Sequence, residues 1–180
     1  MFKKFSPEET ISSTSQVKNS VQRSIISQIV EQYPLLTDAI ETLLPKKALL
    51  VAKCPENVQL IIVNDEILFY SQKDGPFYPS LRLVHKYPAM INRMQVDKGA
   101  IRFVLAGANI MCPGFTSPGG DLPVSVGVDQ PVAIYAEGKQ HAMAIGLTKM
   151  STEDIKSVNK GIAVDNIHYL MDGLWQNPSV

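Results

Sequence analysis

The sequence contains only two cysteines, Cys54 and Cys112, and they do not form a Cys-x-x-Cys motif. A disulfide framework or a structural zinc site within this chain is therefore not expected. No apolar run approaches the ~18 residues that a membrane-spanning helix requires. The first ten residues, MFKKFSPEET, carry two lysines with no apolar segment behind them, so they do not resemble a secretory signal. We expect a soluble cytoplasmic protein with two reduced thiols.

The residues that catalysis requires are also sparse. The three histidines, His85, His141 and His168, lack the spacing of metal ligands, and neither a Gly-x-Ser-x-Gly motif nor a Walker lysine is present. Cys112 is followed by Pro113 and has no neighbouring base to activate it. We expect His85 at a surface or an interface, and the other two histidines in structural positions within strands. The sequence predicts a protein that is not an enzyme and that uses no cofactor and no metal.

The formal net charge of the 180-residue chain is zero, but its charges are unevenly distributed. Between residues 70 and 102 six cations stand against two anions, whereas from residue 129 onward four cations stand against six anions. A basic middle on a neutral chain favours a directed surface that attracts phosphates, although a chance cluster of solvated charges gives the same count. The six cations are Lys73, Arg82, Lys86, Arg93, Lys98 and Arg102.

The first half of the chain has the pattern of a small α+β unit. Apolar residues recur every four positions from Val17 to Ile29, which predicts an amphipathic helix capped by Ser13 or Thr14. Two β-rich runs flank Asn64-Asp65, which predicts a hairpin. The predicted elements are helices at 17–33, at 37–44 and between Pro79 and Pro88, and strands at 48–54, 58–63 and 66–72.

The second half has short apolar runs separated by Gly and Pro turns, which predicts a compact β-barrel with small helices. Ser151, with Asp154 three residues later, is typical of a helix start. We place the domain boundary near residues 92–95, which divides the chain into an α+β domain over 1–93 and a barrel domain over 94–175. The predicted elements are helices from Gly99 to about Ala106 and from Ser151 to Val158, a hairpin over 132–147 around Glu137-Gly138, and a last strand at 162–170.

The segment from Val96 to Gly114, VDKGAIRFVLAGANIMCPG, combines a short apolar helix with flanking glycines and two cations. Glycine destabilises a helix, so its repeated use indicates that another group comes close to the backbone. Lys98 and Arg102 are four residues apart and therefore share one helix face, from which they can neutralise neighbouring phosphates. The segment favours contact with a nucleic acid.

This segment resembles the opening of a PUA domain, the RNA-binding module named after pseudouridine synthases and archaeosine transglycosylases. That family begins with a strand, a Gly-Ala-led helix, a Gly-Ala pair and a Pro-Gly turn, as in Gly99-Ala100, Gly107-Ala108 and Pro113-Gly114. Nearly all of residues 60–175 also resemble the malignant T-cell-amplified sequence (MCTS) family, whereas over 1–57 only MFKKF, LLPKK and the helix pattern agree. The motifs that carry this likeness are GPFYPSLRLVHKYP, EGKQHAMAIG, MSTEDI, VNKGI and NIHYLMDGLW.

The resemblance implies an α+β fold in which a small N-terminal domain precedes a PUA-type β-barrel with short helices. It also implies a translation factor that binds tRNA and the small ribosomal subunit together with a density-regulated-protein partner. Such a factor removes deacylated tRNA after termination and supports reinitiation. The alternative is an accessory or RNA-binding component of an RNA-modification system, because PUA domains often accompany such enzymes. A third possibility is a protein-interaction module that does not bind RNA.

The resemblance further indicates how RNA would be received. Glycines would let the sugar-phosphate backbone approach main-chain N–H groups, and the two cations would contact phosphates. Met111, Cys112 and Pro113 would form an apolar ledge, although core packing is an equally good reading of the first two. Ser117, which precedes Pro118, is also a candidate phosphate acceptor. The expected RNA-binding residues are Lys98, Gly99, Arg102, Gly107, Met111, Cys112, Pro113, Gly114, Thr116, Ser117, Lys139 and Gln140.

A second candidate surface lies in the segment GPFYPSLRLVHKYP, which mixes aromatic and basic residues. Such a mixture suits either rRNA or a protein partner. Packing between the two domains is the alternative for Phe77 and Tyr87. The expected residues of this surface are Phe77, Tyr78, Arg82, His85 and Lys86.

Overall fold

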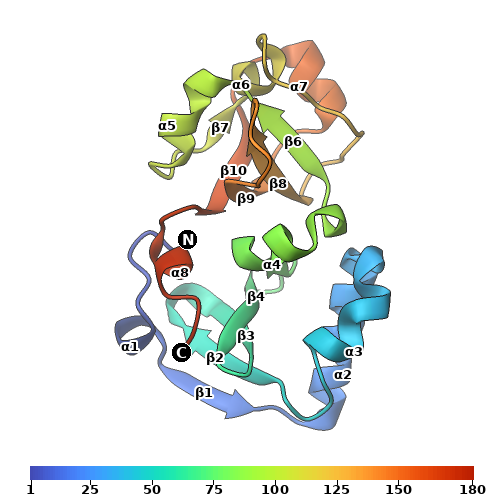
Figure 1. Ribbon diagram of the computed structural model, residues 1–180, viewed down its shortest axis with the longest axis vertical. Helices are drawn as coiled ribbons and strands as arrows, with labels where there is room; N and C mark the ends of the chain where they lie inside the picture. The colour runs from blue at the N-terminus through green and yellow to red at the C-terminus, as the bar shows by residue number, and fades with distance from the viewer.

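The computed structural model describes all residues 1–180 and consists of two lobes, each built on a five-stranded sheet (Figure 1). Their strand orders are β1-β2-β3-β4-β5 and β6-β8-β9-β10-β7. All pairs are antiparallel except β6 with β8. The strands are β1 (Ser13–Gln16), β2 (Leu50–Cys54), β3 (Val58–Val63), β4 (Glu66–Gln72), β5 (Tyr78–Pro79), β6 (Arg93–Val96), β7 (Ile110–Met111), β8 (Pro131–Ala136), β9 (Ala144–Thr148) and β10 (Ile162–Tyr169). This arrangement confirms the predicted α+β class.

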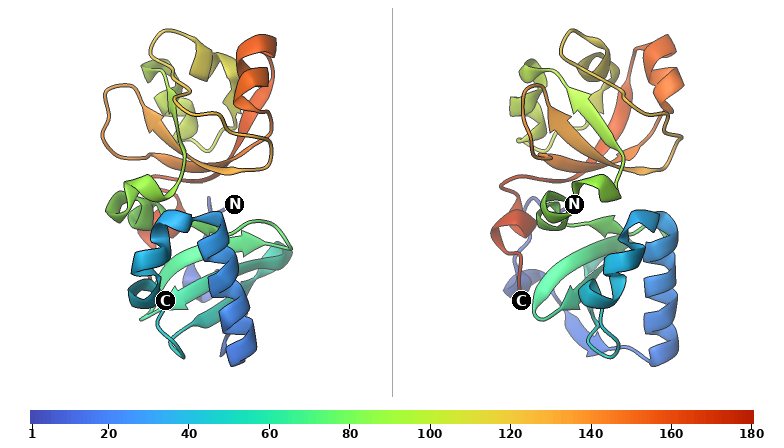
Figure 2. Two further views of the ribbon diagram at one scale, coloured as in Figure 1. Left: turned by 90° about the vertical axis from the view of Figure 1, so that its right-hand side faces the viewer. Right: turned by 45° about the vertical axis from the view of Figure 1, so that its right-hand side comes forward.

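The helices are short, and none is long and apolar enough to cross a membrane. In the first lobe, α2 and the turns that follow it pack along one face of the sheet (Figure 2). The α-helices are α1 (Pro7–Thr10), α2 (Asn19–Gln32), α3 (Ile40–Leu43), α4 (Leu81–Lys86), α5 (Ile101–Val104), α6 (Cys112–Thr116), α7 (Thr152–Val158) and α8 (Gly173–Gln176). The 3-10 helices are η1 (Pro34–Ala39), η2 (Pro55–Asn57), η3 (Pro88–Met90) and η4 (Lys98–Ala100).

Most of the local signals in the first lobe are confirmed. Ile25 and Ile29 of α2 are buried in the core, as their spacing predicts. Asn64 and Asp65 form a two-residue turn with φ angles of 50° and 63°, the left-handed conformation that a tight hairpin needs. The predicted cap of α2 is wrong, because Ser13 and its neighbours form strand β1, paired with β2. The predicted helix over 37–44 is instead the 3-10 helix η1 followed by one turn of α3.

The second lobe also follows its local signals. The Ser151 hydroxyl accepts a hydrogen bond from the Asp154 N–H at 3.2 Å, which caps α7 as predicted. Residues 137–143 connect β8 to β9, so the predicted hairpin has a longer loop than a Glu137-Gly138 turn alone. Residues 112–116 form α6, where a Pro-Gly turn was expected.

Strand β8 joins the two lobes because both of its faces are buried. Val132 and Ile134 belong to the core of the second lobe, whereas Ala133 and Tyr135 belong to the core of the first. This alternation is the period of two that a strand imposes on its side chains. The two lobes therefore share apolar packing across the second sheet, which fixes how they sit against each other.

The C-terminal segment returns to the first lobe after β10. Leu174, in the expected domain over 94–175, packs with the first core, and Val180 N–H donates to the Asp65 carbonyl at 2.9 Å. Gly173 N–H donates to the Phe2 carbonyl at 2.8 Å, and a Cβ at Gly173 would overlap the backbone of Phe5. The N-terminus and α8 thus lie at the waist between the lobes, and the chain ends against the first lobe (Figure 1).

A buried polar cluster ties β10 to α4 at this waist. The Leu81 N–H donates to His168 Nε2 at 3.2 Å, and His168 Nδ1 lies 2.7 Å from Asp172 Oδ2. Because Nε2 accepts a hydrogen bond, His168 is neutral and its Nδ1–H donates to Asp172. Burial lowers the pKa of His168 from its ordinary value, and this outweighs the opposing effect of Asp172. The expectation of a structural histidine at this position is confirmed.

We expect the stability of the protein to fall as the pH drops below about 6.5, where an unfolded histidine takes up a proton. The pKa of His168 is lowered in the fold, so the unfolded state binds the extra proton first and unfolding becomes easier in acid. The free energy of unfolding should fall by about 1.4 kcal/mol per pH unit, which corresponds to one extra proton bound by the unfolded state. Urea unfolding between pH 8 and 5 measures it. His168→Gln, which offers a donor and an acceptor but does not titrate, should make the free energy of unfolding less dependent on pH. An equally steep dependence in that variant would show that it does not come from His168.

Candidate nucleic-acid interface

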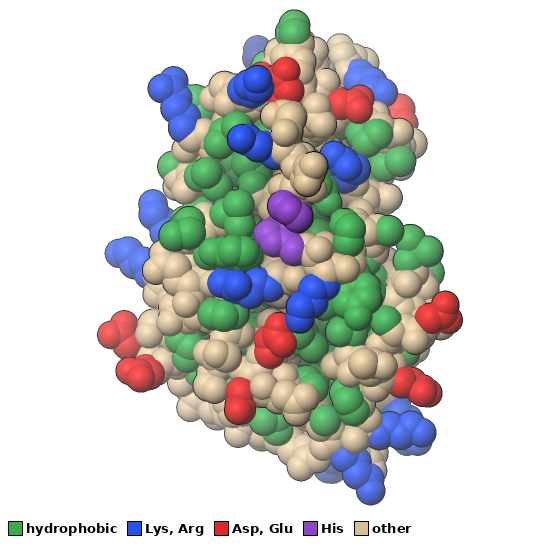
Figure 3. Space-filling model, viewed as in Figure 1, with side chains coloured by type: hydrophobic (Ala, Val, Ile, Leu, Met, Phe, Trp, Pro, Cys, Tyr) green, Lys and Arg blue, Asp and Glu red, His purple; other side chains and the backbone are tan.

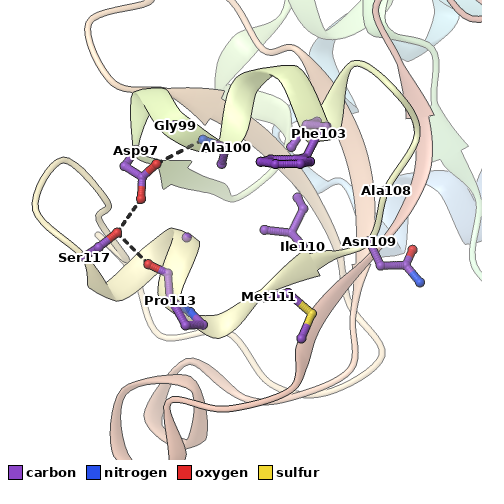
Figure 4. A pocket seen from close by; sticks show the side chains of 12 residues that line it. Asp97, Gly99, Ala100, Phe103, Ala108, Asn109, Ile110, Met111, Pro113 and Ser117 are labelled. Atoms are coloured by element: carbon purple, nitrogen blue, oxygen red, sulfur yellow. Dashed lines mark hydrogen bonds between the residues drawn. The ribbon is translucent and has the colours of Figure 1, made fainter.

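The second lobe contains an open pocket of about 450 Å³ between the segment 97–104 and the segment 108–117 (Figure 4). One wall is η4 with α5, and the other is β7 with the start of α6. Both walls come from the glycine-flanked stretch that the sequence singles out. This stretch folds back on itself, so one continuous piece of chain makes the whole site.

The turns of this stretch have specific local causes. The Asp97 carboxylate accepts a hydrogen bond from the Ala100 N–H at 3.0 Å, which caps the start of η4. Gly107 turns the chain back with a φ of 91°, and a Cβ there would lie 3.1 Å from the Tyr169 hydroxyl. Glycine at position 107 is therefore required by the turn and by the packing of Tyr169. Gly107 does not line the pocket. Gly99 and Gly114, which the sequence predicts to contact RNA, do line the pocket.

The middle of the pocket is apolar and exposed. Phe103 is 53% exposed and Met111 is 48% exposed, and both line the pocket, Phe103 on the wall formed by α5 and Met111 on the wall formed by β7 (Figure 4). Pro113 and Ile110 complete this part of the lining. Large apolar side chains held open to solvent inside a concavity are typical of a ligand-binding surface.

Polar groups stand at the two ends of the pocket (Figure 4). At one end the Ser117 hydroxyl lies between the Asp97 carboxylate and the Pro113 carbonyl, the latter at 2.6 Å. At the other end the Asn109 side-chain oxygen accepts a hydrogen bond from the Asn166 N–H at 2.9 Å. The pocket therefore offers an apolar slot with hydrogen-bonding groups at its limits.

The two predicted phosphate ligands lie beside the pocket, on the wall that carries Phe103. Lys98 and Arg102 are exposed, and neither side chain forms an ion pair. The Arg102 guanidinium lies 4.8 Å from the centre of the Phe103 ring, so a cation borders the apolar slot. A polyanion that placed one unit in the slot would find positive charge at its rim.

Cys112, Lys139 and Gln140, which were expected at the RNA surface, do not line the pocket. Cys112 is fully buried, with its sulfur 3.5 Å from the Met150 sulfur, because the change from β7 to α6 turns it inward. It is therefore part of the core and not of a ledge. Lys139 and Gln140 are exposed in the β8–β9 loop but do not line the pocket.

The hydroxyl of Thr116 also points away from the pocket. It donates a hydrogen bond to the Asn159 side-chain oxygen at 2.5 Å, which links α6 to the end of α7. Ser117, in contrast, lines the pocket. It is half-buried, so a phosphate on it would bring negative charge against Asp97.

The second predicted surface is largely interior. Phe77 and Tyr78 are buried, and the Tyr78 ring stacks on Tyr70 with 5.4 Å between ring centres. Arg82 donates to the Trp175 carbonyl at 2.8 Å and lies over its ring. These residues therefore hold the waist together instead of forming a free surface.

Two members of that second surface keep some exposure. Lys86 is exposed, and His85 is partly exposed while its Nε2 lies 2.8 Å from the Ala142 carbonyl. His141 lies in the β8–β9 loop and not in a strand as expected, and its ring centre is 5.3 Å from that of His85. Figure 3 shows histidine side chains at the waist with Lys or Arg side chains above and below them.

The sequence pattern does not single out Phe103, Asp97 or Asn109 as site residues. Phe103 reads as part of an apolar helix, in which Ile101, Val104 and Leu105 supply the buried side. In the structure α5 is a single turn and only Val104 of these is buried. The one available signal is the position of Phe103 beside Arg102, which places an aromatic ring next to a cation.

Comparison with known proteins agrees with this architecture. A Pre-PUA-like domain model matches residues 5–88, and a PUA domain model matches residues 92–170. The chain is 52% identical to malignant T-cell-amplified sequence 1-A of Xenopus laevis over 176 residues, with 97% of each protein covered. It is 53% identical to malignant T-cell-amplified sequence 2 of Homo sapiens, again with 97% of each covered. The chain belongs to the MCTS family.

A further relative matches this chain over its full length, and two solved structures share its fold. The homologue from Dictyostelium discoideum is 50% identical over 181 residues, with 100% of both proteins covered. A crystal structure of a hypothetical protein from Pyrococcus horikoshii has a TM-score of 0.72 and 25% identity, covering 93% of this chain and 100% of that one. A PUA domain protein from Thermoplasma acidophilum shares the fold, with a TM-score of 0.64, 19% identity, and coverage of 91% of this chain and 98% of that one. This MCTS-family chain is thus an RNA-binding protein with its pocket in the PUA domain.

Proposed function

We propose that this chain is a non-catalytic translation factor that holds the single-stranded 3′ end of a tRNA in the pocket of its PUA domain. It acts with a density-regulated-protein partner on the small ribosomal subunit in the cytoplasm, where it promotes release of deacylated tRNA and (re)initiation. The proposal of RNA binding rests on one observation. The exposed Phe103 and Met111 line an apolar pocket, and the exposed cations Lys98 and Arg102 lie on the wall that carries Phe103. Family membership supports the translational part.

The chemistry of the slot favours an unpaired base. Base–aromatic stacking contributes ~1–3 kcal/mol per base and needs an open face on both rings. In a duplex those faces are covered by neighbouring bases, so protein stacking is confined to loops, bulges and ends. Phe103 presents such an open face at the pocket (Figure 4). The 3′ end of a tRNA is single-stranded and meets this requirement.

The pair of cations predicts a shallow salt dependence. If Lys98 and Arg102 each contact one phosphate, the affinity for a single-stranded end should fall with salt at a slope of ~0.7 per contact, for about two to four contacts in all. We expect Lys98→Ala with Arg102→Ala to reduce that slope by ~1.4 and to weaken binding for all sequences alike. The loss of stability should stay within ~0.5 kcal/mol, because both residues are exposed. Fluorescence titrations at several salt concentrations give the slope.

The matched control is Lys46→Ala with Lys53→Ala, which removes two exposed cations from the first lobe. This pair should leave the slope unchanged. An unchanged slope in the folded Lys98/Arg102 variant would place the phosphate contacts elsewhere on the molecule.

Sucrose-gradient sedimentation tests the ribosomal part of the proposal. Tagged protein should migrate with small subunits and carry a stoichiometric second protein with it. Migration exclusively with free tRNA, in the presence of intact subunits, would contradict a role on the ribosome. Release of deacylated tRNA from reconstituted post-termination subunits then measures the activity itself.

A further inference from the structure

The pocket contains one acidic residue, Asp97, among its twelve lining residues. A carboxylate repels phosphates, so its presence inside a pocket for RNA requires a reason. As a helix cap alone, Asp97 could be replaced by Ser or Asn, which cap about as well without a charge. The charge therefore points to a role toward the ligand.

The Asp97 carboxylate is held in place and still has acceptor capacity. One oxygen accepts from the Ala100 N–H at 3.0 Å, and the other accepts from the Ser117 hydroxyl. A carboxylate has about four acceptor sites, two on each oxygen, so each oxygen of Asp97 can accept one more hydrogen bond. Figure 4 shows this pair at one end of the pocket, beyond the slot between Phe103 and Met111.

The charges around the site lie in different places. The Arg102 guanidinium borders the Phe103 ring, where it attracts phosphates, whereas Asp97 lines the pocket at the end away from that ring (Figure 4). Lys98 follows Asp97 in the chain but does not line the pocket. A nucleotide in the middle of an RNA chain has phosphates on both its 5′ and 3′ sides and would bring one of them toward Asp97. Only a terminal nucleoside can keep its single phosphate on the cationic side and present uncharged donors to the carboxylate.

We propose that Asp97 makes the pocket selective for RNA 3′ ends that carry free hydroxyl groups. The carboxylate accepts hydrogen bonds from the 2′- and 3′-hydroxyls of the terminal ribose, and it rejects a 3′-terminal phosphate, which has two negative charges and no comparable donor. This inference rests on the proposed function, because it requires an RNA end in the pocket. It adds that the unmodified terminal diol is the chemical group recognised.

The test uses three forms of one fluorescent oligonucleotide ending in single-stranded CCA. These carry a 3′-hydroxyl end, a 3′-phosphate end, or a 2′,3′-dideoxy end. We expect the phosphate to weaken binding at least about tenfold, which corresponds to ~1.4 kcal/mol. The dideoxy end, which loses the donors without adding charge, should weaken binding about threefold to tenfold.

The matched variant is Asp97→Asn, which keeps an oxygen for the Ala100 N–H and replaces the charge by an amide that can donate to Ser117. The variant should bind the 3′-hydroxyl end only about twofold more tightly than the 3′-phosphate end, because an uncharged amide does not repel the phosphate. Its melting curve should be unchanged. Asp129→Asn removes one negative charge from an exposed turn with a φ of 59°, which asparagine also adopts, and should leave the preference intact.

The outcomes separate this inference from the proposed function. Equal affinity of the wild-type protein for all three ends, with binding still lost in Phe103→Ala, would overturn the selectivity while leaving the pocket as the RNA site. Unchanged discrimination in Asp97→Asn would likewise overturn the role of this carboxylate. No binding of any form by the wild-type protein would overturn the proposed function and the inference together.

Discussion

Phe103→Ala is expected to weaken binding of a single-stranded CCA end by about 5- to 150-fold, which is the loss of one base–aromatic stacking interaction of ~1–3 kcal/mol. Phe103 is 53% exposed, so it contributes little to the core and the fold should survive its truncation. The loss should affect all bases to a similar extent, because stacking depends on the face of a base and not on its edge. Fluorescence anisotropy with a labelled oligonucleotide measures it.

Two variants separate stacking from general damage to α5. Phe103→Tyr keeps the aromatic face and should retain most of the affinity. Leu105→Ala truncates an exposed apolar residue that follows α5 but does not line the pocket, and it should have no effect. A loss in Leu105→Ala as large as that in Phe103→Ala would show that the pocket is not the binding site.

Asp172→Ala is expected to destabilise the protein by ~3–5 kcal/mol, because it leaves several buried donors without a partner. Asp172 is 2% exposed and accepts from His168 at 2.7 Å, from the Tyr169 N–H at 3.0 Å and from the Trp175 N–H at 2.9 Å. These contacts hold β10 and α8, the elements through which the PUA domain returns to the first lobe. Urea unfolding compared with the wild-type protein gives the difference.

The control is Asp165→Ala, a half-buried aspartate of β10 whose carboxylate forms no hydrogen bond. It should cost no more than ~0.5 kcal/mol. If Asp172→Ala does not fold, Asp172→Asn should give a measurable intermediate loss, since the amide keeps one acceptor but turns its NH₂ toward other donors. A loss below ~1 kcal/mol in the alanine variant would mean that the waist does not depend on this cluster.

The parts of the fold that local signals determine could be predicted from the sequence. The hairpin at Asn64-Asp65 and the cap at Ser151 depend on a few adjacent residues, and both are present. Strand β1 could not be predicted, because its four residues are polar and exposed and it exists only through pairing with β2. The return of the C-terminal segment depends likewise on distant partners, such as Phe2 for Gly173.

The same distinction applies to the pocket. Glycines and cations marked the stretch that forms the pocket, because they act through backbone geometry and charge that are visible in the sequence. Phe103 was not singled out, and for Cys112 the sequence could not separate an apolar ledge from core packing, since the exposure of these residues is decided by the length of α5 and by the switch from β7 to α6. Apolar residues have no local signal that separates a ligand-binding wall from a core.

The most direct test of the central claim is to locate the 3′ end of a bound tRNA on the protein. A deacylated tRNA with 8-azidoadenosine as its terminal nucleoside is bound to the complex of this chain with its partner and the small subunit, irradiated, and the crosslinked peptide is identified by mass spectrometry. A crosslink within residues 97–117, lost in Phe103→Ala, is the predicted result. Crosslinks confined to residues 1–90 would contradict the assignment of the pocket as the tRNA site.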